Sequence, residues 1–223
     1  MFSSRGMVTR TKILTAMQEL LAEREYITIT TADVANRAGV NEALIYHYFK
    51  NKDDLLWSVL EEYMQEYVDF VKRSVEGAKD YSDKLRKVIW ANIFQLLRDH
   101  PGGKIMLLES RNNKHYFATE AYNLSLINVQ IILDIVKKGI AAGEFSEKIN
   151  PHALRNLISG AIEHAVMPVM LFMKSRNTNE LSEQICEIIF KSIRKKENIT
   201  AERLVERLDS IEEEIRNLKH GIE

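Results

Sequence analysis

The stretch from Thr28 to Trp57 constrains the fold more than any other part of the chain, because it contains two short helix patterns separated by a glycine. Thr30 and Asp33 have the spacing of a capping box at the start of the first helix. Gly39 stands where this helix must end, since glycine tolerates the positive φ of a sharp stop. The second pattern, residues 42–49, follows at once. A helix, a short turn and a second helix form the arrangement that places a recognition helix in the major groove of DNA.

The helices on either side of this stretch indicate a three-helix head attached to a larger body. An amphipathic helix is expected over residues 9–24, preceded by a mobile N-terminal arm. Asn51 can cap a further helix that starts at Lys52 and carries an apolar stripe to about Val75. A helix of this length extends beyond a small DNA-binding head. We therefore expect it to connect the head mechanically to the rest of the protein.

The composition excludes several other classes of protein. Hydrophobic residues make up 45% of the 223 residues, enough for a sizeable core, whereas the formal net charge is -1. A uniformly basic nucleic-acid-binding protein is therefore excluded, and DNA contacts must come from a local surface. The single cysteine, Cys186, allows no internal disulfide, and no apolar run approaches the ~20 residues of a membrane-spanning helix. These features favour a cytoplasmic protein with no membrane partner.

The rest of the chain shows helical periodicity and no strand pattern, so we predict an all-α fold. His100–Gly103 is expected to form a turn. Further helices are expected over residues 82–99, 104–112, 119–142, 150–174 and 178–196. A heptad-like pattern at the C-terminal end predicts an extra amphipathic helix that packs on its own body or on another subunit. The expected divisions are a helix-turn-helix DNA-binding domain at 1–50, a helical body at 51–197 and the heptad-like helix at 198–223.

Taken together, these residues resemble the tetracycline-repressor-like (TetR) family of transcription regulators. The matching positions are Thr30, Thr31, Asp33, Val34, Ala35, Ala38, Gly39, Val40, Asn41, Ile45, Tyr46, Tyr48, Phe49, Asn51, Lys52 and Leu55. Ala43 and Leu44 stand where the family often has Gly-Thr or Pro-Thr, so one hydroxyl for a phosphate contact is missing. The resemblance implies a homodimer whose helical C-terminal domain, residues 51–197, serves ligand binding and dimerisation. Ligand binding would shift the two heads and release the operator.

A set of eight side chains in the head is predicted to contact DNA. They are Thr31, Asn41, Glu42, Ala43, Tyr46, His47, Tyr48 and Lys52. Thr31 and Lys52 stand at helix N-termini, where backbone N–H groups bind phosphate, and Lys52 adds a full charge. Glu42 and Ala43 match family positions that approach bases, where a carboxylate can accept from cytosine and a methyl group can touch thymine. Core packing is an equally good interpretation for Tyr48.

A largely apolar effector pocket is implied in the body. Its candidate residues are Trp90, Phe94, Met106, Tyr122, Glu163, Met167 and Met170. Methionine fills irregular shapes, which suits a cavity for flexible apolar ligands. Glu163 interrupts the most apolar helix, and its carboxylate needs a partner, which a cationic or hydrogen-bonding ligand or a basic side chain could supply. The alternative interpretation is that each large apolar residue belongs to the core.

The sequence predicts no enzyme, no metal site and no cofactor. The histidines lack metal-ligand spacing, and Ser192 and Lys195 form an isolated nucleophile-like pair. We therefore predict a ligand-responsive repressor that binds a near-palindromic site on double-stranded operator DNA as a homodimer. A small, largely apolar effector would release it. Two alternatives stay open: an effector-independent or architectural DNA-binding protein, and a helical small-molecule carrier whose head does not bind DNA.

Overall fold

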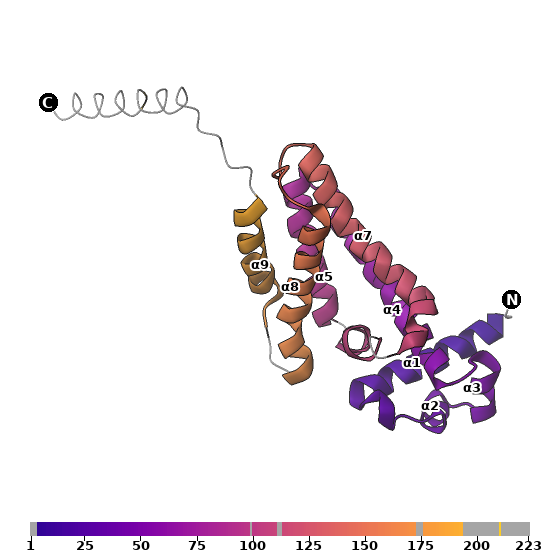
Figure 1. Ribbon diagram of the computed structural model, residues 1–223. Helices are drawn as coiled ribbons and strands as arrows, with labels where there is room; N and C mark the ends of the chain where they lie inside the picture. The colour runs from indigo at the N-terminus through magenta and orange to yellow at the C-terminus, as the bar shows by residue number, and fades with distance from the viewer. Residues whose placement is uncertain (1–3, 99, 111–112, 173–175, 194–209, 211–223) are drawn as a thin grey trace.

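The computed structural model describes residues 4–98, 100–110, 113–172, 176–193 and 210, and these residues form helices and no strand (Figure 1). The predicted all-α fold is therefore confirmed for the described part of the chain. The predicted heptad-like helix at 198–223 lies outside the described residues, apart from Ser210.

The head consists of α1 (Ser4–Glu23), the short 3-10 turn η1 (Tyr26–Thr28), α2 (Thr31–Ala38) and α3 (Glu42–Tyr48). Its buried core includes Ile13, Leu14, Met17, Val34, Ile45 and Phe49. Because α1 already begins at Ser4, the expected mobile arm before residue 9 is wrong for residues 4–8. These residues extend the amphipathic helix.

The predicted caps set the turn between the two helices of the motif. The Thr30 side chain accepts from the Asp33 N–H at 3.1 Å, and the Asp33 carboxylate accepts from the Thr30 N–H at 2.9 Å. Gly39 has φ 66°, the left-handed conformation that ends α2. Asn41 then caps α3 by accepting from the Ala43 N–H at 2.9 Å. Three local signals thus fix the angle at which α3 leaves α2.

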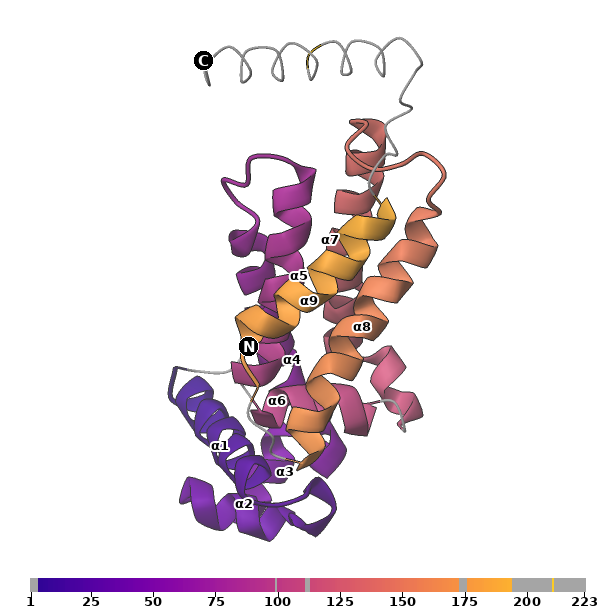
Figure 2. The ribbon, with the colours of Figure 1, turned by 90° about the vertical axis from the view of Figure 1, so that its left-hand side faces the viewer.

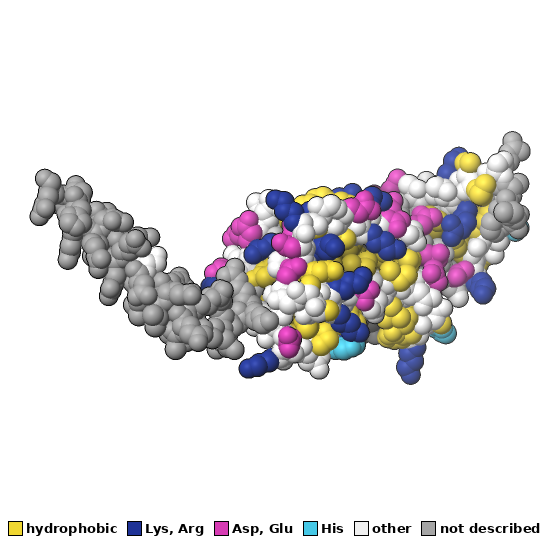
Figure 3. Space-filling view, turned by 90° about the horizontal axis from the view of Figure 1, so that it is seen from above, with side chains coloured by type: hydrophobic (Ala, Val, Ile, Leu, Met, Phe, Trp, Pro, Cys, Tyr) yellow, Lys and Arg dark blue, Asp and Glu magenta, His cyan; other side chains and the backbone are white. Residues whose placement is uncertain are grey.

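The helix α4 (Lys52–Ser74) starts in the head and runs into the body, as the sequence indicates (Figure 1). In the body it packs along α7 (Glu120–Ala141) and against α5 (Tyr81–Arg98). α8 (Pro151–Phe172) and α9 (Thr178–Ile193) cover the other side of α5 (Figure 2). Seen from above, basic and acidic side chains are interspersed over the body, with hydrophobic side chains exposed between them (Figure 3).

The predicted turn at His100–Gly103 is wrong, because these residues form α6 (His100–Lys104). The two glycines permit close packing within a helix. A Cβ on Gly102 would lie 2.4 Å from Cδ2 of Tyr63, and one on Gly103 would lie 2.5 Å from Cε of Met170. Over the described residues, the expected helix at 104–112 continues α6 as a π-helical segment, η2 (Ile105–Glu109). A 3-10 segment, η4 (Lys114–Ala118), comes after it.

Candidate functional site

The start of α2 and the outer side of α3 form an exposed polar surface on the head. Thr31 Oγ1 donates to Glu42 Oε1 at 2.6 Å and lies 3.1 Å from the Tyr46 hydroxyl. Ala43 and His47 are exposed beside them, and Tyr46 is 54% exposed. The structure thus brings these five predicted side chains together on one projecting surface. Their donors, acceptors and methyl group are of the kinds that read base edges and phosphates.

Two other predicted DNA-binding residues have structural contacts of their own. Asn41 is exposed, but its side chain caps α3. Tyr48 is half-buried, and its ring meets His47 edge-on with centroids 5.0 Å apart. Both residues therefore help to hold α3 in place at the edge of the exposed surface.

Lys52 is the first residue of α4, as the sequence analysis expects, but its ammonium is hydrogen-bonded to the backbone of the head. Its ammonium donates to the carbonyls of Tyr26, at 3.1 Å, and Ile29, at 2.9 Å. The same ammonium lies 4.1 Å from the centroid of the Tyr26 ring. The half-buried ammonium of Lys52 thus points toward the connection between α1 and α2. Its hydrogen bonds hold that connection against the start of α4.

Most cations of the head are paired with acids. The pairs are Arg10–Glu62 at 3.4 Å, Arg24–Asp33 at 3.1 Å, Arg37–Glu19 at 3.3 Å and Arg37–Glu23 at 2.8 Å. The Arg37 hydrogen bond holds the pKa of the Glu23 carboxyl below its usual value. Among the residues that the structure describes, Lys12 and Lys50 are exposed and form no ion pair. Lys50 lies two residues beyond the end of α3. The sequence analysis did not include it among the DNA-binding residues, because its position relative to that surface depends on where the helix ends.

A cavity of about 250 Å³ lies in the body between α4, α5, α7, α8 and the segment that contains η2 and η4. Met106 and Glu163, two of the predicted pocket residues, line it. The full lining is Met64, Tyr67, Asn92, Leu96, Met106, Leu107, Ser110, Tyr116, Phe117, Ser125, Asn128, Val129, Ile132, Ser159, Ile162 and Glu163. This volume is near the lower end of ligand pockets, about 300–1,000 Å³. It is large enough for part of an elongated ligand.

The other predicted pocket residues lie outside this cavity. Trp90 stacks on Phe94 with centroids 4.9 Å apart, and its indole N–H donates to Asn179 Oδ1 at 2.7 Å. Met170 is buried where α8 approaches Gly103. Tyr122 packs edge-on against the rings of Tyr116 and Phe117, and Met167 is partly buried on α8. None of these residues lines this cavity: Met170 is buried, and the others are partly buried.

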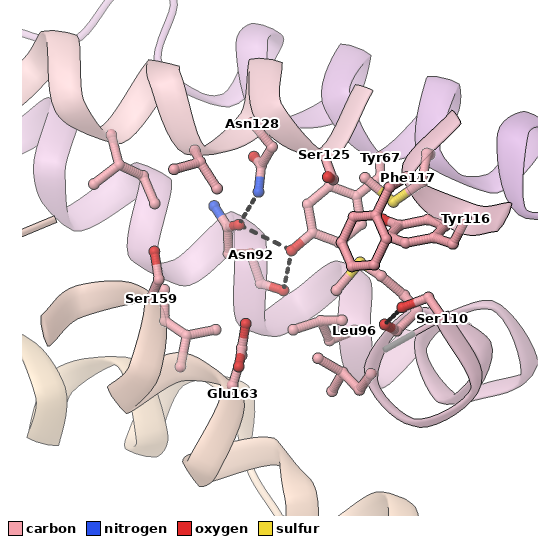
Figure 4. A pocket seen from close by; sticks show the side chains of 16 residues that line it. Tyr67, Asn92, Leu96, Ser110, Tyr116, Phe117, Ser125, Asn128, Ser159 and Glu163 are labelled. Atoms are coloured by element: carbon pink, nitrogen blue, oxygen red, sulfur yellow. Dashed lines mark hydrogen bonds between the residues drawn. The ribbon is translucent and has the colours of Figure 1, made fainter. Parts of the chain in front are cut away.

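The inner wall of the cavity carries a polar network that the sequence analysis missed (Figure 4). The Tyr67 hydroxyl donates to Asn92 Oδ1 at 2.9 Å, and Asn128 Nδ2 donates to the same oxygen at 2.8 Å. Asn92 Nδ2 in turn donates to the Val88 carbonyl at 2.7 Å. Burial, together with the nearby Glu163 charge, raises the pKa of Tyr67, which keeps its hydroxyl protonated as a donor. The detectable signal was Asn92, a polar residue within the apolar face of its helix.

One wall of the cavity also touches the start of α4. The Tyr116 ring lines the cavity and lies 5.7 Å from the Trp57 ring, centroid to centroid. Nearby, Asn113 Nδ2 donates to Asp53 Oδ2 at 3.5 Å, and Asp53 also accepts a hydrogen bond from the Tyr26 hydroxyl. A continuous set of contacts thus joins the cavity wall to the head.

The described residues include no group of three or more His, Cys, Asp or Glu side chains arranged to hold a metal ion. Among the described helices, none has the length and apolar character needed to cross a membrane.

A helix-turn-helix head joined by one long helix to a cavity-containing helical body defines a DNA-binding transcriptional regulator with a ligand-binding domain. Comparison with known proteins supports this class. Residues 13–59 match the model of bacterial regulatory proteins of the tetR family, and residues 60–192 match that of the YsiA-like protein C-terminal region. The chain belongs to the TetR family.

Individual relatives are also regulators rather than enzymes. The fatty acid metabolism regulator protein of Bacillus subtilis is 26% identical over 185 residues, which cover 83% of this chain and 95% of the relative. The crystal structure of FadR from Bacillus subtilis in complex with stearoyl-CoA has a TM-score of 0.72 and 27% identity, and covers 80% of this chain and 96% of that one. The structure of the ketosteroid transcriptional regulator KstR2 of Mycobacterium tuberculosis has a TM-score of 0.67 and 18% identity, so it shares the fold. The match covers 88% of this chain and 98% of the KstR2 chain.

Proposed function

We propose that the protein is a cytoplasmic repressor that binds a near-palindromic operator as a homodimer and is released by an effector with a long apolar part, such as a fatty acyl-CoA. The observation that carries this proposal is the direct contact between the cavity wall and the start of α4, through Tyr116 and Trp57. An effector that displaces Tyr116 would act on the helix that holds the head. The likeness to the FadR complex with stearoyl-CoA supports an acyl thioester as the first effector to test.

The head, residues 1–50, would supply the DNA contacts. We assign base contacts to Glu42, Ala43 and His47, which are exposed on α3. Phosphate contacts are assigned to Thr31, Tyr46 and, in addition to the predicted set, Lys50. Asn41 and Tyr48 would hold the edge of this surface and contact the sugar-phosphate backbone from there.

The body, residues 51–197, would supply the dimer interface through α8 and α9. Large apolar side chains are exposed on these two helices: Leu157 (57%), Leu171 (50%), Phe172 (67%) and Ile188 (70%). If these side chains form one contiguous apolar patch across α8 and α9, that patch would be the surface on which a second subunit packs. In light scattering after gel filtration, Leu157→Glu combined with Ile188→Glu should convert a dimer to a monomer. Ile27→Glu, at a still more exposed aliphatic residue of the head (81%), is the matched control and should stay dimeric.

Operator release tests the whole proposal. Purified protein should bind the promoter region next to its own gene with an affinity that falls as salt rises. Added stearoyl-CoA should release that DNA, whereas free CoA at the same concentration should not. Binding that no acyl-CoA reverses would favour the effector-independent alternative. Acyl-CoA binding without salt-sensitive DNA binding would favour the carrier.

A further inference from the structure

The polar wall of the cavity has most of its hydroxyl protons already engaged. The Tyr67 hydroxyl donates to Asn92, the Ser110 hydroxyl donates to the Met106 carbonyl at 2.5 Å, and the Ser125 hydroxyl donates to the Tyr122 carbonyl at 2.7 Å. Each of these oxygens can now only accept a further hydrogen bond. These three hydroxyls therefore present only acceptors to whatever occupies the cavity.

Two more polar side-chain atoms on this wall are without a hydrogen-bond partner among the described residues, an amide oxygen that can only accept and a hydroxyl that can donate or accept. They are Asn128 Oδ1 and Ser159 Oγ, both buried. Asn128 is on α7 and Ser159 is on α8, and Figure 4 shows their polar ends directed toward the same space, with the Glu163 carboxylate one turn further along α8. The 16 lining residues include no Lys, Arg or His.

This distribution disfavours two kinds of occupant. A plain methylene chain would seal the unpartnered oxygens away from water without replacing their hydrogen bonds, which is costly for buried polar groups. A carboxylate or phosphate would meet more acceptors and the Glu163 side chain, with no cation to compensate. A hydroxyl group suits both atoms, because it can donate its proton to Asn128 Oδ1 and its oxygen can accept from the Ser159 hydroxyl.

We propose that the effector is an elongated apolar molecule that carries a hydroxyl group in its apolar part, and that Asn128 and Ser159 select this hydroxyl. The proposal rests on the proposed function only in assuming that this cavity is the effector site. It adds to the proposed function a preference for a hydroxyl group, which a saturated acyl chain does not carry. Asn92 is a positioning residue, since its side-chain oxygen holds Asn128 Nδ2 and thereby leaves Asn128 Oδ1 facing the cavity.

The first test compares stearoyl-CoA with a series of hydroxystearoyl-CoAs in which the hydroxyl is moved along the chain. Isothermal titration should find at least one position that binds about tenfold more tightly than stearoyl-CoA, equivalent to about 1.4 kcal/mol. In Asn128→Leu, which nearly preserves side-chain shape, the ratio of the two affinities should fall to about one. Ser159→Ala should also reduce this ratio. Asn123→Leu, at an exposed asparagine of the same helix that does not line the cavity, is the matched control and should leave the ratio unchanged.

A second pair of probes keeps the proposal testable if no acyl-CoA binds. Decan-1-ol and decyl methyl ether share a chain and an oxygen, but only the alcohol donates a hydrogen bond. The alcohol should raise the melting temperature more than the ether in the wild type and not in Asn128→Leu. That result, with no acyl-CoA binding, would reject the acyl-CoA effector and keep the hydroxyl site. Equal effects of both probes, together with no preferred hydroxystearoyl isomer, would overturn the inference. Stronger binding of decylamine than of decanol would overturn the hydroxyl assignment in favour of a cation beside Glu163.

Discussion

Replacement of Lys52 by methionine keeps most of the apolar stem of the side chain and removes only the ammonium. In the structure, that ammonium makes two charge-assisted hydrogen bonds, to the carbonyls of Tyr26 and Ile29, and a cation–π contact with the Tyr26 ring. Hydrogen bonds to a charged group contribute about 1.5–3 kcal/mol each, and an exposed to half-buried cation–π contact about 0.5–2 kcal/mol. Because Lys52 is only half-buried, solvent screens part of this sum. We expect Lys52→Met to lower the free energy of unfolding by about 2 kcal/mol.

Urea unfolding followed by far-UV circular dichroism measures this loss, and Lys50→Met is the matched control. Lys50 is exposed and forms no ion pair within the described part of the chain, so Lys50→Met should leave the free energy of unfolding unchanged. It should instead reduce the salt dependence of operator binding by about 0.9 for each phosphate that Lys50 neutralises. An unchanged urea midpoint for Lys52→Met would refute the reasoning. A fall in salt dependence for Lys52→Met alone would return Lys52 to the phosphate-binding role that the sequence predicts.

Three further predictions concern packing, pH and base readout. Gly139→Ala should lower the free energy of unfolding by about 1–3 kcal/mol, measured by urea unfolding. The reason is that the new Cβ would lie 2.2 Å from Cε2 of the buried Phe145. An unchanged free energy of unfolding would mean that the Phe145 ring can move aside. Hydrogen bonds from Thr30 lower the pKa of the Asp33 carboxyl below its ordinary value of 3.8. The ionised carboxylate therefore stabilises the fold fully when the pH is above 3.8, and this stabilisation is lost as the pH falls below that value. Asp33→Asn should therefore flatten the acid side of the stability–pH profile, and an unaltered profile would exclude this group as a cause. Glu42→Ala should change base preference on a randomised operator library more than total affinity, and identical selected sequences would argue against base contact by Glu42.

The head could be predicted closely from sequence because its turns depend on single residues. The Thr30–Asp33 capping box, the left-handed Gly39 and the Asn41 cap are all where local rules place them. Asn51 likewise accepts from the Asp54 N–H at 2.7 Å at the start of α4. Such signals need no knowledge of the tertiary structure.

The segment after α5 could not be predicted in this way, because its glycines serve packing between distant helices. Gly102 and Gly103 lie in a helix against Tyr63 and Met170, and nothing in the local sequence distinguishes that use from a turn. Pro101 is also tolerated there, since the first turn of a helix does not need its missing N–H.

The cavity was only partly predictable for a related reason. Size and hydrophobicity selected Met106, which lines the cavity, but they also selected Trp90 and Phe94, which stack on each other elsewhere. The functional distinction lies in Asn92 and Asn128, whose polar groups meet only after α5 and α7 pack together. Polar residues on apolar helix faces would have been the better guide.

The π-helical segment changes which backbone carbonyls accept hydrogen bonds from Ser110 in the cavity wall. The Ser110 N–H donates to the Ile105 carbonyl, while the Ser110 hydroxyl takes the Met106 carbonyl that an α-helical N–H would use. Because Met106, Leu107 and Ser110 all line the cavity, the wider turn of this π-helical segment sets where three lining side chains lie. The cavity wall is therefore shaped by backbone hydrogen bonding as well as by the choice of side chains.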